Sequence, residues 1–207
     1  KNLTTAEGGA ICFNLPDPFS NNKIYDDLRI KSLHGQTKDA LTKSKIGGWE
    51  YDIIEPGYKF NMPDVLAAIG LVEIDRYSET LLKRKEIFEI YTEKLSSQKW
   101  AIIPEYINEI KTSSFHLYLL RIKGFNEEKR NQLINRMSKK GIATNVHYKP
   151  LPLLSLYKGL GYKMKSYPMA YSYYEQEISL PVYYDLSKQD SLEVVETLIE
   201  EVTSINA

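Results

Sequence analysis

The stretch Lys1-Asn2-Leu3-Thr4-Thr5-Ala6-Glu7-Gly8-Gly9 opens the chain and leads into the apolar run Ala10-Ile11-Cys12-Phe13. A polar, glycine-ended loop before an apolar run predicts a turn followed by a short buried strand. A sheet would then hold the lysine rigidly while its amine faces a cleft, which is the placement that a Schiff-base lysine needs. From spacing alone, however, a solvated lysine before an ordinary turn is the favoured interpretation.

Further strings along the chain strengthen the functional interpretation of its first residues. They are Ser32-Leu33-His34-Gly35, Pro56-Gly57-Tyr58-Lys59-Phe60-Asn61-Met62-Pro63-Asp64 with Ala67-Ala68-Ile69-Gly70, Val146-His147-Tyr148-Lys149-Pro150, and Ile178-Ser179-Leu180-Pro181. Together with residues 1–9 they resemble, in the same order, the DegT–DnrJ family of sugar aminotransferases. The resemblance extends over nearly the whole chain.

This resemblance implies a fold class, the α/β fold of type I pyridoxal-phosphate transferases. It implies that residues 1–62 are a remnant of the large cofactor-binding domain and the end of its sheet. Residues 63–98 are then a long connecting helix, and residues 99–207 are a small C-terminal α+β domain. It also implies that sequence upstream of Lys1 is missing, so that apolar surface of the large domain is exposed.

Composition excludes several classes of function. Lysine plus arginine and aspartate plus glutamate both total 27, so the net charge of zero gives no electrostatic case for nucleic acid or for an anionic membrane. No stretch approaches the roughly 20 consecutive apolar residues that cross a bilayer. The single cysteine, Cys12, excludes an intramolecular disulfide and a cysteine-cluster metal site, and its apolar surroundings predict a buried thiol. We therefore expect a soluble, cytoplasmic protein without a metal site.

Capping residues and apolar periodicity predict the helices. They predict a helix capped by Ser20 that closes before His34, a run from Asp64 to about Leu95 that is one long helix or two joined near Ser78, a helix between Asn126 and Gly141, a short helix from Tyr171 to Gln176, and a last helix capped by Ser187. Residues 36–58 show no period and predict a long irregular loop.

Apolar and β-branched runs predict strands over residues 115–122, 142–146 and 178–183. The second of these strands would deliver His147 at its end. With the helices between them, the strands predict a small α+β sandwich in which helices cover a sheet on one side.

The resemblance gives Lys1 a catalytic role. In the family, the lysine at this position holds pyridoxal 5'-phosphate as a Schiff base and then acts as the base that moves the donor's proton. Related sugar dehydratases carry histidine there, so lysine favours transamination.

Lys59 is the second candidate, as a cofactor-binding residue. The segment Gly57–Met62 opens a helix, where free backbone amides suit an anion. In many members of the family the residue at the Lys59 position is asparagine, which reaches across the dimer interface to the cofactor phosphate of the other subunit. Lysine can bind phosphate as a point charge. Many members have arginine where this chain has Asn61, so the chain departs from the family pattern there. The alternative interpretation of Lys59 is a solvated lysine before a capped helix.

His147 and Tyr148 are candidate substrate-binding residues. They resemble the family's His-Tyr-x-Pro loop, which lines the substrate side of the site. From the residues alone, a histidine at a strand end is more often a satisfied structural residue. His34 also matches the family pattern, and a structural role in closing a loop is the favoured interpretation.

The resemblance therefore implies a homodimer with an active site shared between subunits. It would use pyridoxal 5'-phosphate to transfer an amino group from glutamate to a keto nucleotide sugar, and the Tyr-Lys-x-Asn string is similar to the branch that acts on UDP-linked 4-keto sugars. The alternatives are a related sugar dehydratase and a non-catalytic regulatory or interaction module. Most of the family's cofactor contacts precede the lysine, so the chain alone is expected to be inactive.

Overall fold

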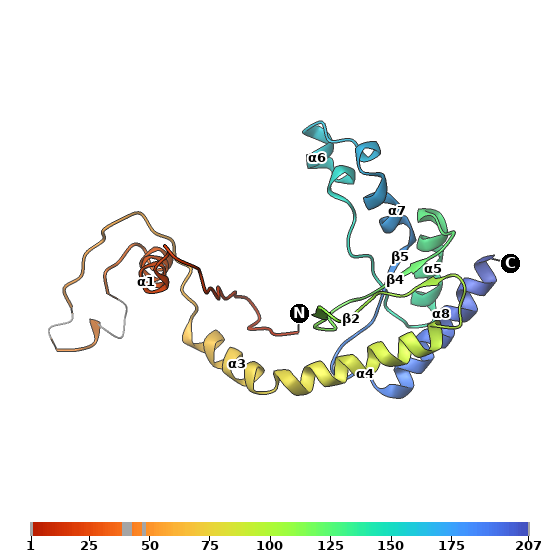
Figure 1. Ribbon diagram of the computed structural model, residues 1–207, viewed down its shortest axis with the longest axis horizontal. Coiled ribbons are helices and arrows are strands. Elements are labelled where there is room, and N and C mark those ends of the chain that lie inside the picture. Colours follow the sequence, from red (N-terminus) through yellow and green to blue (C-terminus); the bar gives the residue numbers. More distant parts are fainter. Residues whose placement is uncertain (1, 39–42, 47–48, 207) are drawn as a thin grey trace. The chain divides into compact units, whose positions relative to one another are not determined.

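A computed structural model describes residues 2–38, 43–46 and 49–206. The described residues form two compact units, one of which is Leu3–Asp75, while the other comprises Asn2 and residues 76–206 (Figure 1). This division does not decide the domain boundaries expected near residues 62 and 98, which stay predictions.

The larger unit is built on an antiparallel sheet with the strand order β1-β4-β5. Its strands are β1 (Ala101–Ile102), β4 (Tyr118–Ile122) and β5 (Glu177–Leu180). Along β4, buried side chains alternate with half-buried ones, as expected for a strand with one face on a core. The strands predicted at 115–122 and 178–183 are thereby confirmed, although both are shorter than predicted.

Helices cover the apolar face of this sheet. They are α4 (Tyr77–Leu95), α5 (Glu127–Lys139) and α8 (Lys188–Asn206), and α8 lies beside α4 (Figure 1). The predicted caps are confirmed, because Asn126 accepts from the backbone N–H of Lys129 at 2.9 Å and Ser187 from that of Asp190 at 3.0 Å. Gly141, with φ +80°, follows the end of α5.

Aromatic rings from α4 and β4 form the centre of the core. Phe88 and Tyr91 both pack edge-to-face on Tyr118, with ring centroids 5.0 and 5.2 Å away. The buried hydroxyl of Tyr91 donates to the carbonyl of Pro181 at 2.8 Å. Burial raises the pKa of Tyr118 to about 12, so its hydroxyl stays neutral.

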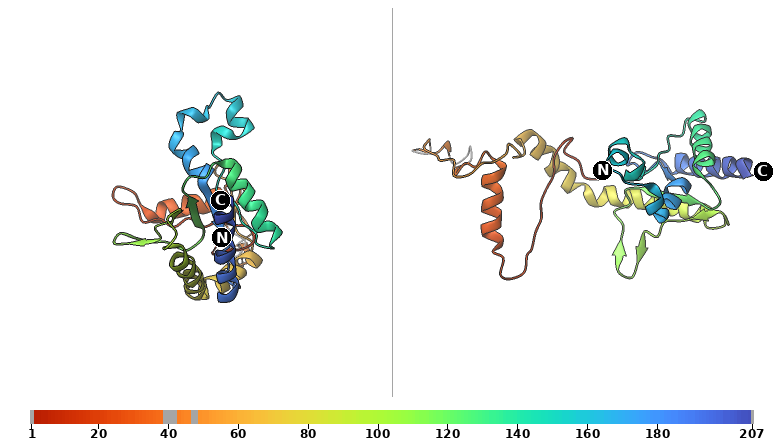
Figure 2. Two further views of the ribbon diagram at one scale, coloured as in Figure 1. Left: turned by 90° about the vertical axis from the view of Figure 1, so that its right-hand side faces the viewer. Right: turned by 90° about the horizontal axis from the view of Figure 1, so that it is seen from above.

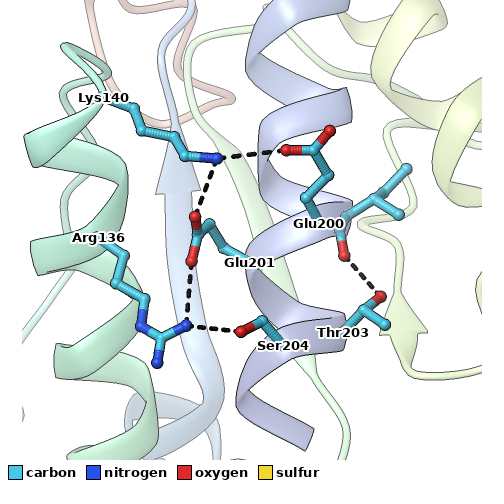
Figure 3. A network of polar contacts seen from close by, with 7 residues as sticks. Arg136, Lys140, Glu200, Glu201, Thr203 and Ser204 are labelled. Carbon is cyan, nitrogen blue, oxygen red and sulfur yellow. Dashed lines mark hydrogen bonds and ion pairs between the residues drawn. The ribbon is translucent and has the colours of Figure 1, made fainter. Parts of the chain in front are cut away.

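Ion pairs join the C-terminal ends of α5 and α8 (Figure 3). Glu201 contacts Lys140 at 3.0 Å and Arg136 at 3.2 Å, and Lys140 also reaches Glu200 at 3.2 Å. The hydrogen bond from Lys140 is the main reason why the pKa of Glu201 is lowered. Since Lys140 is exposed and Arg136 is only half-buried, solvent screens these ion pairs, and the network orients the two helices more than it stabilises them.

Shorter elements complete the larger unit. They are α6 (Ser155–Gly159), α7 (Pro168–Gln176), the 3-10 turns η1 (Leu151–Leu153) and η2 (Met164–Ser166), and a hairpin of β2 (Ile107–Asn108) and β3 (Lys111–Thr112). Figure 2 shows the hairpin projecting from the body of the unit. The helix predicted at 171–176 is confirmed and begins earlier, at Pro168.

The smaller unit contains α1 (Asn21–Ser32) and α3 (Asp64–Asp75). Ser20 caps α1 as predicted, and α3 begins at Asp64 as predicted. The apolar run from Asp64 to Leu95 is two helices, since α3 ends at Asp75 and α4 begins at Tyr77, close to the break predicted near Ser78.

The described part of this smaller unit has no buried apolar side chain, and Gly35 and Gly70 are its buried residues. Helix α3 is apolar on most sides, yet its large side chains are solvent-exposed. They include Val65, Ile69, Leu71, Val72 and Ile74. A helix that is apolar all round is normally buried, so the expected exposure of apolar surface is confirmed.

Two predictions about the first residues are wrong. Ala10–Phe13 is not a strand, and Cys12 is exposed instead of buried. The physical reason is that no strand in the described part of the chain pairs with this segment, and a lone strand has no partner for its backbone groups.

The prediction of a strand over residues 142–146 is also wrong. In this segment the structure has one isolated bridge, between Asn145 and Ser179. Side-chain oxygens take the next two backbone N–H groups, because Val146 donates to Asn145 Oδ1 at 2.7 Å and His147 donates to Glu177 Oε2 at 2.9 Å. Those N–H groups are therefore not available to a longer ladder.

Within the described ranges, no helix has both the length and the apolar character needed to cross a bilayer.

A buried arginine fixes the segment that leads into β4. The side chain of Arg84 is 7% exposed, and it donates from Nε to the carbonyl of Phe115 at 2.8 Å and from Nη2 to that of His116 at 2.7 Å. The same segment binds Asn2. Its Nδ2 donates to the carbonyl of Ser114, and its Oδ1 lies 3.2 Å from Nδ1 of His116. Arg84 thus holds the surface on which Asn2 is anchored.

We predict that Arg84→Ala destabilises the intact protein by about 3 kcal/mol, because two carbonyls lose buried, charge-assisted donors. Urea denaturation measures the change. Lys83→Ala is the matched control, because Lys83 is exposed and makes only a 4.0 Å ion pair with Glu86; it should cost less than about 0.5 kcal/mol. Equal effects of the two variants would contradict the role given to Arg84.

Candidate functional site

Close backbone packing shapes the loop that carries Lys59. The N–H of His34 donates to the carbonyl of Tyr58 at 2.8 Å, and an isolated bridge joins Leu33 to Lys59. Gly35 has φ +72°, and a Cβ there would lie 1.8 Å from the carbonyl oxygen of Glu55. Only glycine fits such an approach, which supports the structural interpretation of His34-Gly35.

Lys59 is exposed and lies on the wall of a cavity in the smaller unit. The cavity is lined by residues of α1, the loop after it, and the side chains of Lys59, Asn61 and Asp64. Among the residues that the structure describes, the Lys59 ammonium donates one hydrogen bond, to Asn61 Oδ1. An ammonium has three donors, so two remain for an anion, and this donor set fits a phosphate group.

Lys1, the predicted catalytic residue, lies outside the described residues. Its neighbour Asn2 belongs to the larger unit through its contacts with Ser114 and His116.

His147 sits on a chain of hydrogen bonds at the edge of β5. Its Nδ1 lies 2.7 Å from Ser179 Oγ, and Ser179 donates to Oε1 of Glu177. The other carboxylate oxygen of Glu177 accepts the backbone N–H of His147 at 2.9 Å. Burial is the main cause of both pKa shifts, since it lowers the pKa of His147 and raises that of Glu177.

Tyr148 lies beside His147, and both residues line a cavity of about 400 Å³. The two rings are edge-to-face with centroids 4.6 Å apart, and Tyr148 is 70% exposed. Arg121 and Tyr173 also line this cavity, with the guanidinium 4.0 Å from the ring centroid. Aromatic surfaces mixed with polar groups suit a small polar ligand with an apolar face.

The structure therefore brings together His147 and Tyr148, while Lys59 lies in the other unit. Sequence reasoning missed Glu177 and Ser179 as partners of His147. A signal was available, because residues 177 and 179 alternate with Ile178 in a strand and must share the face opposite to the core. The missing information was the pairing of residue 145 with residue 179, which brings His147 to that face.

We predict that the His147 imidazole titrates with a midpoint below its ordinary value of 6.5 in the intact protein, because burial disfavours the charged ring. Histidine-selective NMR labelling measures the midpoint, and a His147→Asn variant identifies the signal. A midpoint at or above 6.5 would show that the Glu177 carboxylate outweighs burial.

Comparison with known proteins identifies the family to which the chain belongs. Residues 1–199 match the DegT/DnrJ/EryC1/StrS aminotransferase family. Spr1654 from Streptococcus pneumoniae, assigned as a sugar aminotransferase, is 43% identical in its PMP-form, with a TM-score of 0.92 over 99% of this chain and 51% of that chain. Its PLP-form is 41% identical, with a TM-score of 0.91 over 99% and 50% of the two chains.

Two curated relatives match over most of the chain. The spore coat polysaccharide biosynthesis protein SpsC of Bacillus subtilis is 33% identical over 96% of this chain and 50% of its own length. The UDP-4-amino-4,6-dideoxy-N-acetyl-beta-L-altrosamine transaminase of Campylobacter jejuni is 29% identical over 96% of this chain and 49% of its own length. The chain thus spans about half the length of these relatives.

The similarity to Spr1654 confirms the predicted fold class, because 99% of this chain superimposes on about half of that chain with a TM-score of 0.92. The match over residues 1–199 begins at Lys1 and includes every string on which the family resemblance rested. The chain belongs to the DegT/DnrJ/EryC1/StrS aminotransferase family.

Proposed function

We propose that the intact protein is a pyridoxal-phosphate-dependent aminotransferase that transfers the amino group of glutamate to a keto nucleotide sugar. The observation that carries this proposal is a family match that begins at a lysine, followed by Asn-Leu-Thr-Thr, and continues to residue 199. The relatives named as sugar aminotransferases and transaminases support it. Because the chain spans about half of such relatives, the activity is proposed for the intact protein and not for this chain by itself.

The proposal gives Lys1 two tasks. Its amine holds the cofactor covalently, and once displaced it is the base that carries a proton away from the donor's α-carbon. Pyridoxal phosphate, when bound, supplies an electron sink for the negative charge left on that carbon. Histidine could perform the second task but could not hold the cofactor covalently, and lysine at position 1 therefore favours amino transfer over the dehydratase alternative.

Lys59 is proposed to hold the cofactor phosphate. Its exposed ammonium and the cavity around it support this role. By the family resemblance, the phosphate contacted would belong to the other subunit of a homodimer, which makes dimerisation part of the proposal. A cytoplasmic location, expected from the single cysteine, is proposed with it.

His147 and Tyr148 are proposed to contact the sugar. The support is their common cavity in the larger unit, with aromatic walls and the polar groups of His147 and Arg121. Sugars present hydroxyl groups around an apolar ring face, so a site of mixed aromatic and hydrogen-bonding character suits them.

We predict that Lys59→Ala weakens cofactor binding about tenfold, because one charge-assisted contact to phosphate is lost. Titration of the intact apoprotein with pyridoxal phosphate measures the dissociation constant. Lys23→Ala is the matched control, since Lys23 is another exposed lysine of the same unit and does not line the cavity. An unchanged constant in Lys59→Ala would leave Lys59 as a solvated residue.

We predict that Lys1→Ala in the intact protein abolishes both the visible absorbance of lysine-bound cofactor and glutamate-dependent amination. The reason is that no other amine would be in place to hold the cofactor and move the proton. Absorbance spectra and an assay with a UDP-linked 4-keto sugar measure the two losses, with Lys23→Ala again as control. Retention of both the absorbance and the activity in Lys1→Ala would refute the proposal.

A further inference from the structure

Both carboxylate oxygens of Glu177 are used as acceptors on the face of β5 opposite to the core. Oε2 accepts the backbone N–H of His147 at 2.9 Å, and Oε1 accepts the hydroxyl of Ser179. Glu177 is 6% exposed as a residue, and buried Arg130 lies close by, where its Nη1 is 3.4 Å from the backbone carbonyl oxygen of Glu177. At a pH above its raised pKa, the Glu177 carboxylate is ionised and can only accept hydrogen bonds, which sets the direction of the hydrogen bonds attached to it.

The hydroxyl of Ser179 has one proton, and it donates that proton in a hydrogen bond to Oε1 of Glu177. The contact of 2.7 Å between Ser179 Oγ and His147 Nδ1 therefore needs its proton from the imidazole. A neutral imidazole carries one N–H, so a proton on Nδ1 leaves Nε2 with a lone pair. Within the described ranges, Nε2 makes no hydrogen bond, and His147 lines the cavity beside Tyr148.

We infer that Glu177 is a positioning residue that acts through Ser179 to hold His147 in the Nδ1–H tautomer, so that Nε2 accepts a hydrogen bond from a hydroxyl group of the ligand. The identity of that ligand, a sugar hydroxyl, rests on the proposed function. The tautomer does not, because it follows from the hydrogen bonds within the larger unit.

The other residues that line the cavity agree with a hydroxyl-bearing ligand. Arg121, with its guanidinium on the ring of Tyr173, supplies donors only. A ligand hydroxyl needs an acceptor for its proton, and each oxygen of buried Glu177 already accepts a hydrogen bond from within the larger unit. Nε2 of His147 fills that role only in the tautomer that Glu177 imposes.

Glu177→Gln should reverse the donor and acceptor roles between residue 177, Ser179 and His147 while keeping the same contacts. The amide oxygen of glutamine can still accept the backbone N–H of His147, while its NH₂ group would donate to Ser179 where the carboxylate accepts. Ser179 would then donate its own proton to Nδ1, and the imidazole proton would move to Nε2. A donor would face the ligand hydroxyl in place of an acceptor.

The test is the tautomer of His147, measured by nitrogen-15 NMR of the intact, histidine-labelled protein above the midpoint of its titration, with the signal identified by His147→Asn. We expect a protonated Nδ1 in the wild type and a protonated Nε2 in Glu177→Gln. Glu175→Gln, the same change two residues earlier, should leave the wild-type tautomer. A bare Nδ1 in the wild type, or an unchanged tautomer in Glu177→Gln, would overturn the inference.

Two further measurements keep the inference falsifiable. If Glu177→Gln does not fold, Ser179→Ala breaks the same chain and should shift the ring away from the Nδ1–H form, whereas an unshifted tautomer would overturn the inference. In the amination assay, Glu177→Gln should raise KM for the keto sugar about tenfold and leave KM for glutamate unchanged. An equal rise in both constants would contradict the role at the sugar. Absence of amination in the wild type would refute the proposed function but not the tautomer.

Discussion

Aromatic and aliphatic side chains of α4 and α8 close over one face of the β1-β4-β5 sheet, and the rest of the larger unit depends on that packing. Phe88, Tyr91 and Tyr118 fill its centre, and all three are essentially buried. The packing fixes β5, and β5 carries Glu177 and Ser179 on its other face. The core therefore positions the candidate site from the opposite face of the sheet, without contributing a side chain to the site.

The smaller unit leaves large apolar side chains of helix α3 exposed, and its helix α1 has no buried residue. Each of the relatives compared is about twice as long as this chain. Burial of α3 by other parts of an intact enzyme would make the pocket around Lys59 part of a larger site, which is the arrangement that the proposed function requires.

Local chemistry made much of the fold predictable from sequence. Helix caps such as Ser20 and Asn126 satisfy backbone donors within a few residues, so their effect can be predicted without tertiary structure. The prediction of a strand at residues 10–13 was wrong because a strand needs a partner strand, and local sequence does not show whether one is present. The family strings found His147 and Tyr148, but not Glu177 and Ser179, whose contact with His147 depends on one long-range bridge. The role of Lys1 was predicted from resemblance alone and stays a prediction.

The proposed activity of the intact protein is the transfer of an amino group from glutamate to a nucleotide-linked keto sugar. Incubation with nitrogen-15 glutamate, pyridoxal phosphate and a UDP-linked 4-keto sugar, followed by mass spectrometry of the sugar, measures this directly. The account predicts a UDP-amino sugar that carries the heavy nitrogen, formed in step with 2-oxoglutarate. A sugar product that has lost a hydroxyl group without gaining nitrogen, or no reaction with any keto sugar, would contradict it.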